Sequence, residues 1–259
     1  MDLGIRGRRA MVTGASRGLG RGCAEALAAE GVDLVIAARG REPLEETAAA
    51  IRARHGVAVT AVIADVTTDA GRAALREAAG ELDILVTNAG GPPPGRWEDF
   101  GPEALQRALE ASMLAPIALM RDHLPGMIAR GWGRVVNITS SAVVAPTRAL
   151  GLSTAARMGL TGWVANTARE VAGQGVTINN LLPGSHETDR IRRLDQDAAE
   201  REGLTPEAVR ARALARIPAG RYGDPAAFGA VCAFLCSEQA GYIVGQNILV
   251  DGGAVARTL

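Results

Sequence analysis

The segment Val12–Gly20, with the sequence VTGASRGLG, has the residues and the spacing of a phosphate-binding turn. It follows a short apolar run and opens an Ala- and Leu-rich segment, Leu19–Glu30, whose apolar positions recur at helical spacing. Gly14 permits a tight turn, Gly18 lets the backbone approach a pyrophosphate, and Gly20 lets helix and strand pack closely. The N-terminus of the helix then presents free N–H groups and the positive end of its dipole. The turn therefore predicts a site for the pyrophosphate of a dinucleotide.

The reactive side chains exclude several other chemistries. The 28 basic residues are all arginine, so Schiff-base chemistry and a lysine general base are absent. Cys23, Cys232 and Cys236 are too few for a disulfide framework. The last two share a helix face at i, i+4, but no histidine lies near them in sequence. We predict that the cysteines pack in the core and that the protein has no metal site.

Composition limits the class of protein. A chain of 259 residues with 47% apolar residues can bury one large core, and no shift in composition divides it. The formal net charge of zero argues against nucleic acid or an anionic membrane surface as the main partner. The sequence shows no signal-peptide pattern and no apolar run near the ~20 residues that span a bilayer. We expect a single cytoplasmic domain, residues 1–259, that acts on a small molecule.

Strand and helix patterns alternate along the chain. Continuous apolar strands separated by helices predict a doubly wound α/β fold with a parallel sheet covered on both faces. Ligands bind such sheets beyond the carboxyl ends of the strands. The expected strands are Arg9–Thr13, Asp33–Ala38, Ala58–Ala64, Leu82–Thr87, Arg134–Thr139, Val176–Leu182 and Asn247–Val250. The expected helices are Leu19–Glu30, Glu42–Arg54, Asp69–Ala79, Pro102–Arg130, Thr154–Ala172 and Pro225–Cys236.

Residues 185–220 interrupt this alternation with a polar, arginine-rich stretch. The sequence Thr205-Pro206-Glu207 resembles a helix cap followed by proline at the first helical position, so at least one helix is expected inside. An excursion of this length on the ligand side of a sheet is typical of a lid. A solvated helix face is the simpler interpretation of its arginines, and contact with an anionic substrate is the alternative.

The chain resembles the short-chain dehydrogenase/reductase family over essentially its whole length. The resemblance implies one Rossmann-type domain with about seven parallel strands, usually assembled as a homotetramer or homodimer. The matching motifs are TGASRGLG, Asp65-Val66, Thr87–Gly90, the run GRVVNITSS at Gly133–Ser141, PGSHET at Pro183–Thr188, and VDGG at Val250–Gly253.

By this resemblance Asp65 and Val66 flank an adenine, Asn88 lines the cofactor cleft and Thr188 holds the nicotinamide amide. The full set of expected cofactor residues is Gly14, Ser16, Arg17, Gly18, Leu19, Gly20, Arg39, Asp65, Val66, Asn88, Ala89, Gly90, Pro183, Gly184 and Thr188.

Charge at the second strand favours NADP(H) over NAD(H). An NAD site places a carboxylate there to accept the ribose 2′-OH, but this chain has Ala37-Ala38-Arg39 and no acid. Arg17 lies in the glycine turn. Guanidinium groups are always charged and bind a phosphate with two hydrogen bonds, so Arg17 and Arg39 suit a 2′-phosphate.

The residues that the family uses for chemistry are largely replaced. Ser140 occupies the position of the serine that polarises the substrate carbonyl. The position of the tyrosine that transfers the proton holds Ser153, and the position of its lysine partner holds Arg157. The position of the family's asparagine holds Ser112. The chain thus lacks the Tyr-x-x-x-Lys pair.

The replacements remove the usual route of the proton but leave most of the catalytic advantage. Arg157 can still hold ribose hydroxyls, but a guanidinium does not act as a base. General acid catalysis is worth about 10²–10⁴-fold, whereas orientation of the two reactants can supply about 7–11 kcal/mol. Water bound to Ser140 and Ser153 is the favoured proton source, and His186 is the alternative donor. Arg148, between the two serines, could bind a substrate carboxylate or phosphate, or could lie on the surface.

We predict an NADP(H)-dependent oxidoreductase that acts on a carbonyl or alcohol with non-standard proton delivery. Two alternatives stay open. One is a non-redox enzyme on the same scaffold, catalysing elimination, isomerisation or cyclisation. The other is a catalytically inactive nucleotide-binding module.

Overall fold

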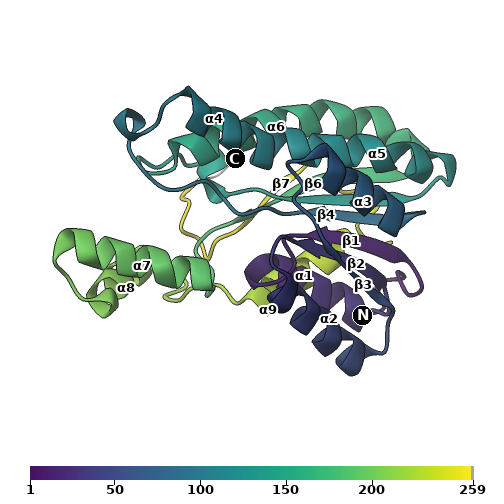
Figure 1. Ribbon diagram of the computed structural model, residues 1–259, viewed down its shortest axis with the longest axis horizontal. Helices are drawn as coiled ribbons and strands as arrows, with labels where there is room; N and C mark the ends of the chain where they lie inside the picture. Colours follow the sequence, from purple (N-terminus) through teal and green to yellow (C-terminus); the bar gives the residue numbers. More distant parts are fainter. Residues whose placement is uncertain (258–259) are drawn as a thin grey trace.

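The computed structural model describes residues 1–257, which form one α/β domain around a seven-stranded sheet (Figure 1). Every strand pair is parallel, and the order across the sheet is β3-β2-β1-β4-β5-β6-β7. The strands are β1 (Arg9–Thr13), β2 (Asp33–Ala38), β3 (Val59–Ile63), β4 (Ile84–Thr87), β5 (Gly133–Ile138), β6 (Val176–Pro183) and β7 (Asn247–Val250). The predicted doubly wound fold is confirmed.

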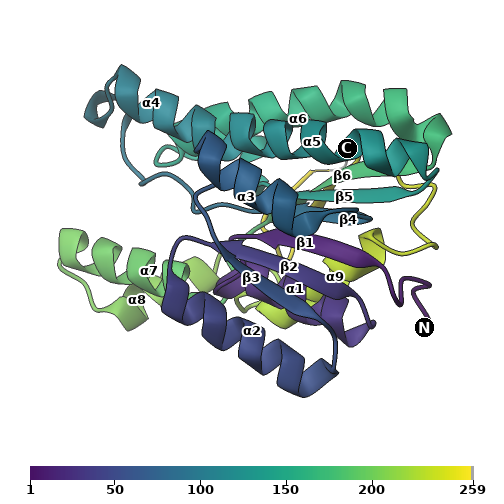
Figure 2. The same cartoon turned by 45° about the vertical axis from the view of Figure 1, so that its right-hand side comes forward.

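Helices cover both faces of the sheet (Figures 1 and 2). One layer contains α1 (Gly18–Ala29), α2 (Arg41–His55) and α9 (Pro225–Leu235). The other contains α3 (Asp69–Ala79), α4 (Pro102–Leu109), α5 (Ala115–Ala129) and α6 (Gly151–Val171). Two further helices, α7 (Asp189–Glu202) and α8 (Pro206–Leu214), project beyond one end of the sheet.

The core is split by the sheet because successive side chains of a strand point to opposite faces. Ala10 and Val12 of β1 are buried among α1, α2 and α9, whereas Met11 between them is buried among the helices of the other layer. Helices α1 and α9 pack closely: a Cβ at Gly22 would lie 2.3 Å from the carbonyl oxygen of Pro225. Apolar burial on both faces explains the continuous apolar strands.

One expected helix differs from the sequence prediction, and the excursion agrees with it. The single helix expected over Pro102–Arg130 is divided by a π-helical segment, η2 (Glu110–Leu114), between α4 and α5. The excursion at residues 185–220 contains two helices, in agreement with the expectation of at least one. The cap predicted at Thr205 is confirmed, since its hydroxyl accepts a hydrogen bond from the N–H of Ala208 at 3.2 Å.

The cysteines pack as predicted: Cys23, Cys232 and Cys236 are free and buried. Within residues 1–257 no group of three or more His, Cys, Asp or Glu side chains is arranged to hold a metal ion. In the same part of the chain, every helix is too short or too polar to span a membrane.

Candidate active site

The turn between β1 and α1 has the backbone that its glycines predict. Gly14 and Gly18 have φ values of 60° and 56°, in the left-handed region that favours glycine. A Cβ at Gly20 would lie 2.3 Å from the carbonyl oxygen of Gly14, so the helix contacts the strand backbone directly. Ser16 lies in this turn, where its carbonyl oxygen accepts a hydrogen bond from the Thr47 hydroxyl at 3.1 Å. Leu19 packs against the core beneath it.

The N-terminus of α1 is open to an anion. Arg17 precedes the helix without a side-chain cap, and the first turn contains no acidic residue. Helix α3, by contrast, is capped by the hydroxyl of Thr68, which accepts from the N–H of Gly71 at 3.0 Å, and it begins with Asp69. The free N–H groups and the helix dipole at Gly18 therefore fit the pyrophosphate of a dinucleotide.

Asn88 joins the ends of β1 and β4 beside this turn. Its amide nitrogen Nδ2 donates to the carbonyl oxygen of Gly14 at 3.2 Å, and its backbone N–H donates to the Thr13 hydroxyl at 2.8 Å. A Cβ at Gly14 would lie 2.7 Å from Nδ2 of Asn88, so only glycine fits opposite this side chain. Ala89 and Gly90 continue the chain from this point along the same edge of the sheet.

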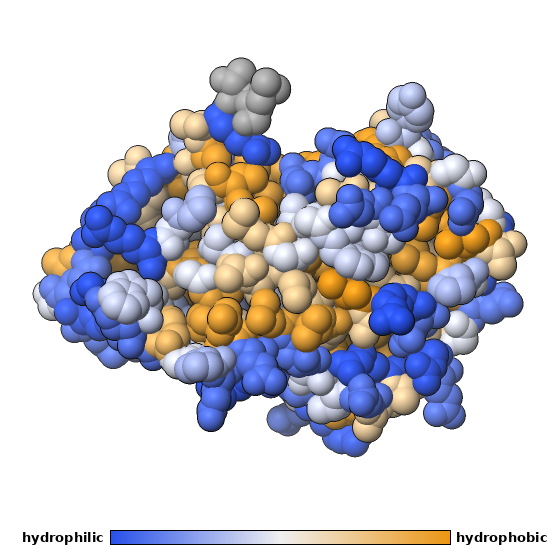
Figure 3. Space-filling model, turned by 90° about the horizontal axis from the view of Figure 1, so that it is seen from above, coloured by the Kyte–Doolittle hydropathy of each residue, from blue (hydrophilic) through white to orange (hydrophobic). Residues whose placement is uncertain are grey.

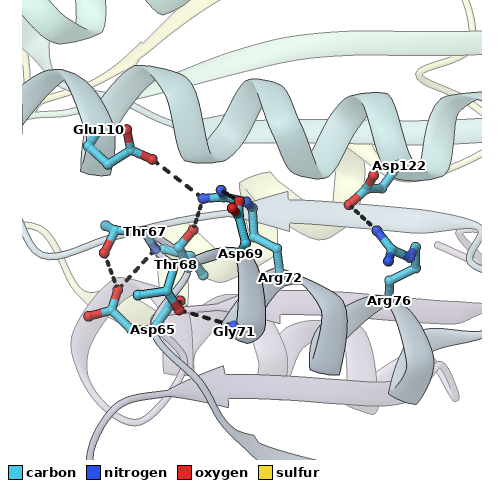
Figure 4. Close-up of polar contacts among 10 residues, drawn as sticks. Asp65, Thr67, Thr68, Asp69, Gly71, Arg72, Arg76, Glu110 and Asp122 are labelled. Atoms are coloured by element: carbon cyan, nitrogen blue, oxygen red, sulfur yellow. Dashed lines mark hydrogen bonds and ion pairs between the residues drawn. The ribbon is translucent and has the colours of Figure 1, made fainter.

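Asp65 and Val66 follow β3 on the same edge (Figure 4). The carboxylate of Asp65 accepts from the N–H and the hydroxyl of Thr67 at 3.0 and 2.7 Å, and these hydrogen bonds lower the pKa of Asp65. Arg39, at the end of β2, lies 3.9 Å from the Asp65 carboxylate and is 78% exposed on its side chain. Arg17 lies 3.7 Å from the carboxylate of Asp189. Both guanidinium groups are thus held loosely, because exposed pairs at these distances are weak.

The π-helical segment η2 is tied to the end of β3 by an arginine. Arg72 on α3 donates to the carbonyl oxygen of Val66 at 2.8 Å and pairs with Glu110, the first residue of η2, at 3.4 Å (Figure 4). Ser112 lies in the middle of η2, where it is buried and its hydroxyl has no hydrogen-bond partner among the described residues. π-helical segments occur frequently at functional sites.

Ser140 lies just beyond the carboxyl end of β5, and Ser153 and Arg157 lie one turn apart near the start of α6. The Ser140 hydroxyl accepts from the N–H of Ala142 at 3.1 Å. Nη1 of Arg157 donates a short hydrogen bond to Oγ of Ser153. This bond uses a lone pair of the Ser153 oxygen, so the hydroxyl proton of Ser153 can be donated to another acceptor.

Arg157 carries a charge that no acid of the described chain neutralises. Its side chain is buried, and within residues 1–257 it forms no ion pair with a carboxylate. Burial, and then the positive charge of Arg190, lower the pKa of Arg157 to about 10. The guanidinium therefore stays protonated at neutral pH, and it leaves a positive charge beside Ser153.

The segment after β6 approaches the glycine turn. Pro183 ends β6, and the N–H of Gly184 donates to the carbonyl oxygen of Val250 on β7 at 3.0 Å. A Cβ at Gly18 would lie 3.2 Å from the methyl group of Thr188. The Thr188 hydroxyl also caps α7 by accepting from the N–H of Ile191 at 3.3 Å. The fold thus brings together two motifs that are 170 residues apart.

The His186 side chain is buried in the protein beside α9. Nδ1 lies 3.1 Å from the carbonyl oxygen of Gly184, and the ring meets the Phe228 ring edge-to-face with centroids 5.1 Å apart. The ring also lies against Gly223, where a Cβ would come within 2.5 Å of it. Burial lowers the pKa of His186, which disfavours its charged form. The alternative of His186 as proton donor stays a prediction, and its ring is buried against Phe228 of α9.

Arg190 connects α7 to the loop after β4, a contact that the sequence did not predict. Its guanidinium donates to the carbonyl oxygens of Gly91 and Pro92 at 2.9 and 3.2 Å. These partners are 99 and 98 residues away in the chain, so no local pattern could indicate the contact. These hydrogen bonds join α7 of the excursion to the loop after β4.

Comparisons with known proteins agree with this architecture. A family model described as Enoyl-(Acyl carrier protein) reductase matches residues 14–255. D-beta-hydroxybutyrate dehydrogenase of Cupriavidus necator is 33% identical over 258 residues, covering 98% of this chain and 100% of the relative. The 3-oxoacyl-[acyl-carrier-protein] reductase FabG of Escherichia coli is 33% identical over 255 residues, covering 97% of this chain and 98% of the relative.

The chain belongs to the short-chain dehydrogenase/reductase family. A solved structure of this kind, L-sorbose reductase from Gluconobacter frateurii complexed with NADPH and L-sorbose, superposes with a TM-score of 0.95. The two chains are 31% identical and each is covered completely. The resemblance drawn from the sequence motifs is confirmed at the level of family and fold, and the relatives are oxidoreductases by name.

Proposed function

We propose that this short-chain dehydrogenase/reductase is an NADP(H)-dependent oxidoreductase that acts on a carbonyl or alcohol substrate. The uncapped N-terminus of α1, with its glycine turn packed on β1, is the observation that carries the proposal. The residues present fit a dinucleotide, and the similar L-sorbose reductase is complexed with NADPH. A bound nicotinamide supplies or accepts the hydride.

The cofactor residues are proposed to bind successive parts of the dinucleotide, from the adenine to the nicotinamide. The turn from Gly14 through Gly20, with Ser16 and Leu19, holds the pyrophosphate. Asp65 and Val66 flank the adenine, and Asn88, Ala89 and Gly90 line the middle of the cleft. Pro183, Gly184 and Thr188 position the nicotinamide amide.

Arg17 and Arg39 are proposed to select NADP(H). They lie near the ends of β1 and β2, and their carboxylate partners are 3.7 and 3.9 Å away. A 2′-phosphate would offer each guanidinium shorter, charge-assisted hydrogen bonds, which are roughly twice as strong as neutral ones. Preference for NADPH over NADH rests on these two side chains.

The reaction centre is proposed to work through hydroxyl groups beside a fixed positive charge. Ser140 donates a hydrogen bond to the substrate oxygen and polarises the carbonyl. Ser153, held by Arg157, orders a water molecule that delivers the proton, because a serine side chain stops short of the substrate. Arg157 holds ribose hydroxyls, and its charge stabilises negative charge that develops nearby. Ser112 takes the place of the family's asparagine in the centre of η2.

The excursion at residues 185–220 is proposed to act as a lid over this centre. Arg190 links α7 to the carbonyl oxygens of Gly91 and Pro92 across the site. Closure by such a contact would exclude water and orient the substrate.

A homotetramer or homodimer is proposed as the working assembly. The face over α4, α5 and α6 has a broad apolar area bordered by hydrophilic residues (Figure 3). Leu114 of η2, between α4 and α5, and Met158 of α6 are exposed. Light scattering after size exclusion would measure the mass, and a monomer would contradict the proposal.

The test of the function is NADPH oxidation, followed by the loss of nicotinamide absorbance, with a panel of ketones, aldehydes and quinones. Turnover with at least one class is expected. Product formed without any change in absorbance would favour a non-redox enzyme instead. Tight NADPH binding with no chemistry would favour an inactive nucleotide-binding module.

A further inference from the structure

A cavity of about 930 Å³ lies between η1 (Trp97–Asp99) with the start of α4 and the first turn of α6. Its walls are largely apolar and include Trp97, Phe100, Leu105 and Leu152. Trp97 is 83% exposed and Leu105 is 40% exposed. An exposed apolar surface in a hollow of this size is typical of a site for a small organic ligand.

The cavity reaches the first turn of α6, the helix that carries Ser153. Gly151 and Leu152 line it, and Ser153 is the next residue of α6. On one side the N–H of Gly95 donates to the carbonyl oxygen of Ala149 at 3.0 Å, which joins the loop after β4 to the segment before α6. A ligand in the cavity therefore lies against the helical turn that carries Ser153.

The charges around the cavity are unbalanced. Two arginines, Arg96 and Arg148, line it together with no acidic residue. The Arg96 guanidinium is neutralised by Glu98, with Nε 3.0 Å from the carboxylate. Arg148 forms no hydrogen bond or ion pair through its side chain within residues 1–257, and it is exposed. Arg148 thus offers both edges of its guanidinium to a ligand.

We propose that the substrate is an oxo or hydroxy acid with an apolar body, which fills this cavity while its carboxylate binds Arg148. The inference rests on the proposed function and names the substrate class for the same site. Apolar walls favour an alkyl or aromatic body, since removing apolar surface from water is the main driving force there. The planar guanidinium pairs with a carboxylate through two parallel hydrogen bonds.

Octanoate and its neutral analogue octanamide test the ligand class without turnover. Trp97 lines the cavity, so binding is followed by tryptophan fluorescence. Octanoate should bind about 10- to 100-fold more tightly than octanamide, which is the range for a hydrogen-bonded charge. Arg148→Gln should abolish that difference, Arg96→Gln should preserve it, and Trp97→Phe should remove the signal.

Equal affinity for the two probes, or a preference for octanoate that survives Arg148→Gln, would overturn the proposal. In turnover, Arg148→Gln should raise KM for an oxo acid by about 10- to 100-fold and leave KM for its methyl ester unchanged. An equal rise for both would also count against it. Binding of octanoate through Arg148 without NADPH oxidation by any substrate would refute the proposed redox function and leave the ligand class standing.

Discussion

The turn after β1 and the segment from β5 into α6 both lie beyond the carboxyl ends of parallel strands, but they are built from different parts of the chain. In the first, the backbone makes the site: Gly14 and Gly18 have positive φ, and Gly20 touches a carbonyl oxygen. In the second, side chains make it, through the hydroxyl of Ser153 and the guanidinium of Arg157. The first site therefore tolerates few residue types at its glycines, whereas the second can change its chemistry by substitution.

This difference would allow the glycine turn to be kept while the reaction centre departs from the family pattern, as we propose. The glycine turn between β1 and α1 depends on close backbone contacts, so a single added carbon atom disrupts it. The reaction centre needs only hydrogen-bonding groups of suitable reach, and Arg157 with Ser153 forms a stable pair without the phenol. Four predictions test the contrast.

Restoring the family pair should have the largest effect. The double variant Ser153→Tyr with Arg157→Lys should raise NADPH-dependent reduction of simple ketones by about 10²–10⁴-fold, which is the usual contribution of a positioned general acid. Steady-state rates measure the gain. Arg157→Lys alone is the control and should gain nothing, because the proton donor is still missing. A double variant that binds NADPH but is no faster would show that the pocket differs from that of ordinary family members.

Disrupting the glycine turn between β1 and α1 should have the second-largest effect. Gly20→Ala places a Cβ 2.3 Å from the Gly14 carbonyl oxygen, so α1 must shift away from β1. Overpacking of this kind costs about 1–3 kcal/mol of stability, and NADPH affinity should fall by about 100-fold as the N–H groups move. Calorimetry of binding and of unfolding measures both. Gly162→Ala in α6 is the matched control: its Cβ meets nothing within 4 Å, and the helix should be stabilised by about 0.5–1 kcal/mol.

Removing the charge after β2 should have a smaller effect, confined to one cofactor. Arg39→Ala should weaken NADPH binding by about 10-fold, the lower range for a charged hydrogen bond, and should leave NADH binding unchanged. Titration with each coenzyme measures the ratio. Arg107→Ala, another exposed arginine, is the control. Equal losses for both coenzymes would mean that Arg39 does not contact the 2′-phosphate.

The smallest effect concerns pH and the buried ring of His186. Burial lowers its pKa below the ordinary 6.5, so the unfolded chain takes up the proton first as pH falls. The stability that the neutral ring contributes is complete above pH 6.5 and is lost as pH falls through the lowered pKa. Thermal unfolding between pH 5 and 8 should show Tm falling on the acid side, and less so in His186→Gln. An identical pH profile in the variant would exclude this ring as a source of the acid sensitivity.

Local patterns predicted the sheet well because its strands are defined by their own apolar runs. The bounds of β1, β2 and β7 agree with the prediction, and the other strands differ by one or two residues at one or both ends. The π-helical segment η2 was missed. Its position depends on contacts with distant elements, such as the pair of Glu110 with Arg72 and the contact of Met113 with Gly159. No periodicity within the helix itself encodes those contacts.

The sequence by itself determined the glycine turn, the missing acid after β2 and the lack of lysine and of a nearby tyrosine, since these follow from residue identity and short spacing. Tertiary structure alone decided that His186 packs on Phe228, that Arg157 is buried with no carboxylate partner among residues 1–257, and that Arg190 reaches Gly91. The reason is physical: a side chain's burial and partners depend on segments that are far away in the chain and meet only when the layers pack.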